Sequence, residues 1–111
     1  MKMRVALLYW THADDSEYGN IFPTAKEDEW HFPIDSQALL PVGSKVHLLD
    51  KKTNKGIDLA VTHWHFDLDD NLLKLQVVVS DECEATPKEF RRYIKKNWLF
   101  GNKIDAWAKM P

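Results

Sequence analysis

Two histidines spaced one residue apart are the first feature of this sequence that could bind a metal. His63 and His65 lie in the stretch THWHFD, residues 62–67, and alternate residues of a β-strand project from the same face of a sheet. With His47 on a neighbouring strand, three neutral imidazoles could hold Zn²⁺ and leave one position open for water. Asp67 could be a fourth ligand or could orient an imidazole. The pattern therefore predicts a candidate zinc site, with exposed histidines that bind nothing as the simpler alternative.

Other chemistry is poorly supported by the residue pattern. The acidic stretch at residues 67–71 fails as a calcium loop, because Leu72 and Val78 stand where that loop needs glycine and a bidentate glutamate. Cys83, the only cysteine, is surrounded by acids that disfavour a thiolate. The four glycines are too scattered to form a phosphate-binding loop. These features favour a non-catalytic protein that needs no cofactor.

The end of the chain is basic and aromatic. Residues 86–111 carry seven lysines and arginines against two acids, whereas residues 12–35 carry seven acids against one lysine. We expect the basic segment to contact another protein, or a second copy of the chain, because exposed aromatic and arginine side chains favour such interfaces. The predicted contact residues are Arg91, Arg92, Lys95, Lys96, Trp98, Phe100 and Trp107.

The same residues allow a second alternative, in which the cations contact phosphates and the aromatic rings stack on bases. The formal net charge of -2 disfavours it, since nucleic-acid-binding domains usually carry an excess of basic residues.

One helix is predicted strongly, over the residues that follow Thr86. Thr86, Pro87 and Glu89 occupy the N-cap, N1 and N3 positions of a capping box. Apolar residues then recur at helical spacing, and basic residues fill the other face. The apolar series is Phe90, Tyr93, Ile94 and Trp98. A second short helix is expected around Ile104 and Trp107.

Most of the remaining chain is predicted to form strands. Residues 3–11 are apolar on both faces, which indicates a buried strand, and the polar residues 12–26 indicate a long loop. Residues 29–34 alternate, but Pro33 favours a sheet edge. Residues 45–61 have the pattern of a hairpin that turns at KKTNKG.

A second hairpin would turn at Asp70-Asn71 and place Trp64 opposite Val77 and Phe66 opposite Leu75. Both aromatic rings would then lie in the core, and the histidines would point outward. The apolar positions are odd-numbered before Thr62 and even-numbered after His63, so a β-bulge is expected there. Trp10 and Trp30 are also expected in the core.

These elements predict an α+β protein: a strongly bent antiparallel sheet or small open β-barrel of five or six strands, with a C-terminal amphipathic helix. With 111 residues, a single domain over 1–111 is expected. The apolar run near the N-terminus is short for a signal peptide, and no stretch is long enough to span a membrane. Together with the single cysteine, these features favour the cytoplasm.

Overall fold

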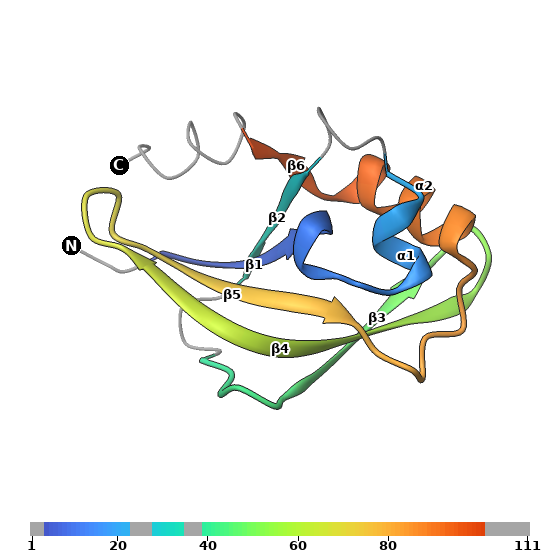
Figure 1. The fold of residues 1–111 in the computed structure, drawn as a ribbon, viewed down its shortest axis with the longest axis horizontal. Coiled ribbons are helices and arrows are strands. Elements are labelled where there is room, and N and C mark those ends of the chain that lie inside the picture. The colour runs from blue at the N-terminus through green and yellow to red at the C-terminus, as the bar shows by residue number, and fades with distance from the viewer. Residues whose placement is uncertain (1–3, 23–27, 35–38, 102–111) are drawn as a thin grey trace.

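The computed structural model describes residues 4–22, 28–34 and 39–101, which form a curled half-barrel sheet with helices on its concave side (Figure 1). Six strands lie in the order β3-β4-β5-β1-β2-β6. The elements are β1 (Arg4–Trp10), the 3₁₀ turn η1 (Thr11–Ala13), α1 (Glu17–Asn20), β2 (Glu29–Ile34), β3 (Lys45–Asp50), β4 (Lys55–Asp67), β5 (Leu72–Val79), α2 (Pro87–Asn97) and β6 (Leu99–Phe100).

The predicted fold class is confirmed, with one difference in strand direction. Strand β1 runs parallel to β5, so that Val5 aligns with Leu73 and Tyr9 with Val77. All the other strand pairs among the described residues are antiparallel. Strand β1 lies in the middle of the sheet, which explains why its sequence is apolar on both faces.

The segment predicted as a loop after β1 contains two short helical turns, η1 and α1. The buried carboxylate of Asp14 organises them, because it accepts hydrogen bonds from the Tyr9 hydroxyl at 2.8 Å and from the Ser16 backbone N–H at 3.0 Å. The Ser16 hydroxyl in turn accepts from the Tyr18 backbone N–H, which caps α1. Burial and the neighbouring Asp14 raise the pKa of Tyr9.

Strand β2 is an edge strand over only part of its length. Trp30 and His31 pair with Phe100 and Leu99 of β6. Pro33 lies beyond this two-residue ladder and pairs only with Ala6 of β1 among the described residues. Pro33, which has no N–H to donate, therefore lies on a part of β2 that no described strand pairs with on its outer side.

Both predicted hairpins form, and the predicted bulge is confirmed between Val61 and His63. The register predicted for the second hairpin is wrong by two residues, since Trp64 aligns with Leu75 and Phe66 with Leu73. Four residues separate β4 from β5, and the last of them, Asn71, has a positive φ of 52°. A shift of two residues keeps every side chain on its predicted face, so the apolar pattern fits both registers.

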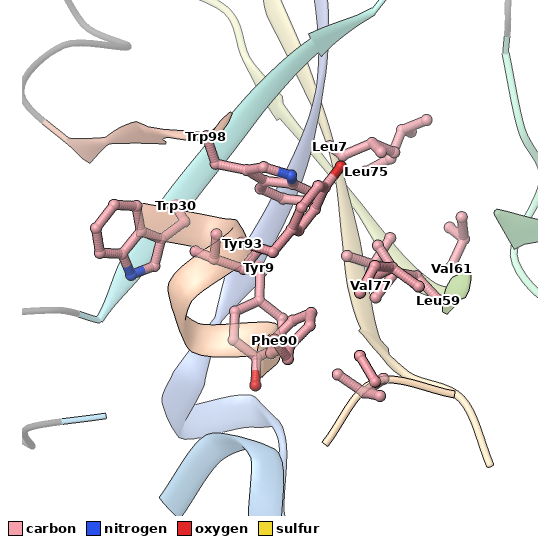
Figure 2. Packing of buried hydrophobic residues seen from close by; sticks show 14 of the residues in the cluster. Leu7, Tyr9, Trp30, Leu59, Val61, Leu75, Val77, Phe90, Tyr93 and Trp98 are labelled. Atoms are coloured by element: carbon pink, nitrogen blue, oxygen red, sulfur yellow. The ribbon is translucent and has the colours of Figure 1, made fainter. Parts of the chain in front are cut away.

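The core lies between α2 and the concave face of the sheet (Figure 2). Phe90, Tyr93 and Ile94 are buried on one side of α2, as their spacing predicts. The rings of Tyr9 and Phe90 meet edge to face, with their centroids 5.0 Å apart. The predicted capping box is present, because Thr86 and Glu89 each accept a hydrogen bond from the other's backbone N–H.

Two ionic contacts join α2 to the turn between β3 and β4. Asp50 and Lys55 are the last paired residues of that hairpin. The Asp50 carboxylate lies 3.1 Å from the Arg92 guanidinium, and the Lys55 ammonium lies 3.0 Å from the Glu89 carboxylate. The backbone N–H of Thr86 and the ammonium of Lys55 hold the pKa of Glu89 low, at about 2. We call these two pairs the hairpin clamp.

Candidate functional site

The predicted cations of α2 gather around one hollow on the surface. Its volume is about 630 Å³, and its described lining consists of five cations and one apolar side chain. The lining residues are Ile21, Lys88, Arg91, Arg92, Lys95 and Lys96. Four of these five cations were predicted as contact residues, and Lys88 adds one more positive charge beside them.

A second hollow, of about 340 Å³, adjoins the first and shares Arg92 and Lys96 with it. It brings in Lys51 and Lys52, which lie in the turn between β3 and β4 and were not predicted. We use the term cationic surface for the set Lys51, Lys52, Lys88, Arg91, Arg92, Lys95 and Lys96. The fold thus adds lysines far away in the sequence to the basic face of α2.

The charges of this surface are not equally available. Arg92 is held by the buried carboxylate of Asp50. Burial raises the pKa of Asp50, but hydrogen bonds from the Lys52 backbone, from Thr53 and from Arg92 outweigh it, so the net pKa is low. Arg92 is therefore part of the hairpin clamp. Lys88 and Lys96 are exposed and are better placed to meet another molecule.

The aromatic residues predicted beside these cations lie elsewhere. Trp98 is only 4% exposed and packs in the core, with its ring 5.4 Å from that of Phe32. Phe100 is half-buried, and its ring lies 5.1 Å from that of Trp30. Trp107 lies outside the described residues, as does the short helix expected around it. Neither described ring lines either of the two hollows.

The histidines lie on the predicted outer face of the sheet, but they do not all converge. The rings of His63 and His65 stack with centroids 6.1 Å apart. His47 instead pairs with the Asp58 carboxylate at 2.8 Å, and Asp67 accepts a hydrogen bond from the backbone N–H of Asp70. In the described part of the chain, no three His, Cys, Asp or Glu side chains lie close enough to hold a metal ion.

A smaller hollow of about 260 Å³ lies on this outer, convex face, beside His65. Lys74 and Gln76 line it from β5, and the Gln76 side chain is 2.8 Å from a ring nitrogen of His65. His31 is nearby on β2 and is almost completely buried. Burial and the charge of Lys74 lower the pKa of His31 to about 4.

The expectation that Trp64 and Phe66 belong to the core is wrong. Both are on the concave side, in line with buried Leu75 and Leu73, yet they are 47% and 49% exposed. Trp10 is also partly exposed, whereas Trp30 is buried as predicted. The apolar pattern indicated the correct face, but not how far along the sheet the helices cover it.

Two groups of residues were missed from the sequence. Lys51 and Lys52 carry a weak signal, since a lysine pair in a turn usually only keeps that turn solvated. Lys74 and Gln76 are polar residues at alternate positions of a strand, a pattern that indicates which face they occupy and nothing more. Which residues lie beside Lys74 and Gln76 depends on the register of four neighbouring strands. Neither pair of residues could therefore be assigned to a hollow from the sequence.

Comparison with protein-family models, with curated proteins and with solved structures found no match. Within the described ranges, no helix has both the length and the apolar character needed to cross a membrane. The function is therefore inferred from the surfaces above.

Proposed function

We propose that this chain is a non-catalytic binding module, and that its cationic surface binds an acidic segment of another protein. The observation that carries the proposal is the first hollow, whose described lining holds five cations and no acid. The adjoining hollow extends the positive charge across the turn between β3 and β4. Clustered charge of one sign in a concave surface attracts a partner of the opposite sign and orients it.

A protein partner is favoured over a nucleic acid by the aromatic residues. Proteins that bind single strands combine cations with aromatic rings on which bases stack. Here Trp98 is in the core, and Phe100 packs against Trp30. The two described aromatic residues that were predicted to stack on bases are thus engaged in packing, which favours carboxylates over bases as the ligand.

Charge reversal at Lys96 tests this proposal, with Lys45 as the matched control. Lys96→Glu changes the cationic surface, whereas Lys45→Glu makes the same change in net charge at an exposed residue of β3 outside both hollows. One pair of charges about 4 Å apart in water contributes about 1 kcal/mol, and salt screens part of it. Replacing an attraction by a repulsion should therefore weaken binding about tenfold.

The measurement is the fluorescence anisotropy of a labelled glutamate-rich peptide, together with pull-down of partners by the folded variants. We expect Lys96→Glu to weaken peptide binding and to lose partners that wild type and Lys45→Glu retain. Equal binding by all three proteins would contradict the proposal. Tighter binding of single-stranded DNA than of the peptide, steeply reduced by salt, would favour the nucleic-acid alternative.

The zinc alternative has its own test. Elemental analysis of protein purified without an affinity tag should show stoichiometric zinc if His63 and His65 take part in a metal site. Absence of both the metal and a thermal shift on adding zinc would remove this alternative. Action in the cytoplasm stays part of the proposal, since the chain has a single cysteine, Cys83.

A further inference from the structure

An apolar strip remains open at the end of the sheet farthest from α2. It consists of Trp64, Phe66 and Leu68, which are 47%, 49% and 80% exposed. Trp64 and Phe66 align with Leu75 and Leu73, two residues of the buried core, so both rings stand on the concave face. We call these three residues the aromatic strip.

The described helices, α1 and α2, do not extend as far as this strip. Figure 1 shows the tip of the β4–β5 hairpin at one end of the long axis, with α1 and α2 over the other end. The bulge between Val61 and His63 separates the two halves of β4. Buried Ile57, Leu59 and Val61 precede it, and the exposed strip follows it. One half of the concave face is therefore covered by a helix, and no helix of the described residues covers the other half.

The strip meets the segment that precedes β3 through one hydrogen bond. The indole N–H of Trp64 donates a hydrogen bond of 2.8 Å to the carbonyl of Leu40. Leu39 and Val42, on either side of Leu40, are also exposed. The bond fixes the Trp64 ring, so its apolar surface is held in place.

The size of this surface suits one helix better than a second copy of the chain. Trp and Phe side chains present about 150–250 Å² each, so the open half of each ring is about 100 Å². With Leu68 the open area amounts to a few hundred Å², on the order of the largest patch of an ordinary monomer. A stable protein pair buries about 800 Å² on each partner.

Charge indicates which kind of helix would fit. The turn that ends the strip carries Asp69 and Asp70, and Asp69 is exposed. Arg4 aligns with Leu72, and Lys74 aligns with Ala6. Leu72 and Ala6 belong to the apolar cluster on the opposite face of the sheet, so these two cations lie on that face and not beside the strip. An approaching helix would therefore meet carboxylates at the edge of the apolar surface.

The covered half of the sheet shows how a helix binds to this face. Helix α2 places Phe90, Tyr93 and Ile94 against the sheet and keeps its lysines and arginines outward. We propose that the aromatic strip binds an amphipathic helix of a partner protein, with apolar residues facing Trp64 and Phe66 and basic residues facing Asp69 and Asp70. This inference goes beyond the proposed function, since it uses a different surface and a partner segment of opposite charge.

The experiment uses a labelled synthetic helix with leucines at helical spacing and lysines on its other face. A second peptide carries glutamate in place of each lysine. Phe66→Ser and Leu68→Ser test the strip. Leu49→Ser is the matched control, since Leu49 is 48% exposed but lies on β3, where it lines the second hollow and not the strip. Near-ultraviolet circular dichroism checks that each variant is folded, and Leu68, in an exposed turn, is the safer substitution.

We expect the basic helix to bind wild type and Leu49→Ser equally. It should bind Phe66→Ser and Leu68→Ser each about tenfold more weakly, because the two substitutions remove similar areas of exposed apolar side chain. Lys96→Glu should bind it as wild type does, which separates this result from that of the proposed function. Equal binding by Leu68→Ser and wild type, or equal binding of the acidic peptide, would overturn the inference. So would dimerisation in sedimentation that Leu68→Ser abolishes, since the strip would then bind a second copy.

Discussion

The buried imidazole of His31 makes the stability of this protein depend on pH in the mildly acidic range. The residue is 1% exposed, and neither ring nitrogen has a hydrogen-bond partner among the residues that the structure describes. Burial and the charge of Lys74 lower the pKa of His31 from 6.5 to about 4. The folded state therefore takes up a proton at lower pH than the unfolded state does.

The direction of the effect follows from proton linkage. As pH falls through 6.5, the unfolded imidazole gains a proton while the folded imidazole stays neutral, so the free energy of unfolding decreases. The stability is fully present above that pH and is lost progressively down to the folded pKa of about 4. Between about pH 7 and pH 5, these two pKa values give a loss of about 2 kcal/mol.

Urea denaturation of wild type and His31→Leu at the two pH values measures this loss. Subtracting the variant removes the contribution of groups that both proteins share. Leucine also removes two buried, unpaired ring nitrogens, so the variant should be at least as stable as wild type near pH 5. If both proteins lose the same unfolding free energy, within about 0.5 kcal/mol, the account of a neutral buried His31 is wrong.

Other predictions concern the bulge, the helix cap and the buried tyrosine. Deleting Thr62 should unfold the protein or greatly lower its melting temperature. One residue fewer turns the apolar side chains that follow to the opposite face of the sheet. The control Thr62→Ala keeps the number of residues and should melt near the wild-type temperature. Thr86→Ala should lower the free energy of unfolding in urea by about 1 kcal/mol, since the first turn of α2 loses a hydrogen bond. An unchanged urea midpoint would mean that the cap with Glu89 contributes nothing to stability. Tyr9→Phe should destabilise by about 1–3 kcal/mol because the buried Asp14 carboxylate loses a donor, and a smaller loss would mean that water replaces the hydroxyl.

Local patterns predicted the fold where the deciding interactions are themselves local. The capping box and apolar spacing of α2 lie within the helix, so Thr86 and Phe90 could be assigned from the sequence alone. The bulge was visible because one extra residue, Thr62, reverses the alternation. The direction of β1 beside β5 has no such signal, because both directions bury the same apolar faces.

The candidate site was harder to predict because it depends on contacts between distant segments. Lys51 and Lys52 join the basic face of α2 only through the packing of the hairpin. Trp98 continues the apolar spacing of α2, and the same spacing puts it in the core rather than on the surface. Whether Trp64 is covered depends on where α2 ends over the sheet, which no property of β4 encodes.

The hairpin clamp has a consequence for how the molecule opens. Asp50 and Lys55 close the β3–β4 hairpin, and each holds a residue of α2, Arg92 and Glu89, one helical turn apart. The helix cannot leave the sheet without breaking both contacts, and fraying of the hairpin end breaks the same two contacts. Amide hydrogen exchange should therefore report α2 and this hairpin end as one cooperative unit, while the β4–β5 tip opens independently at lower cost.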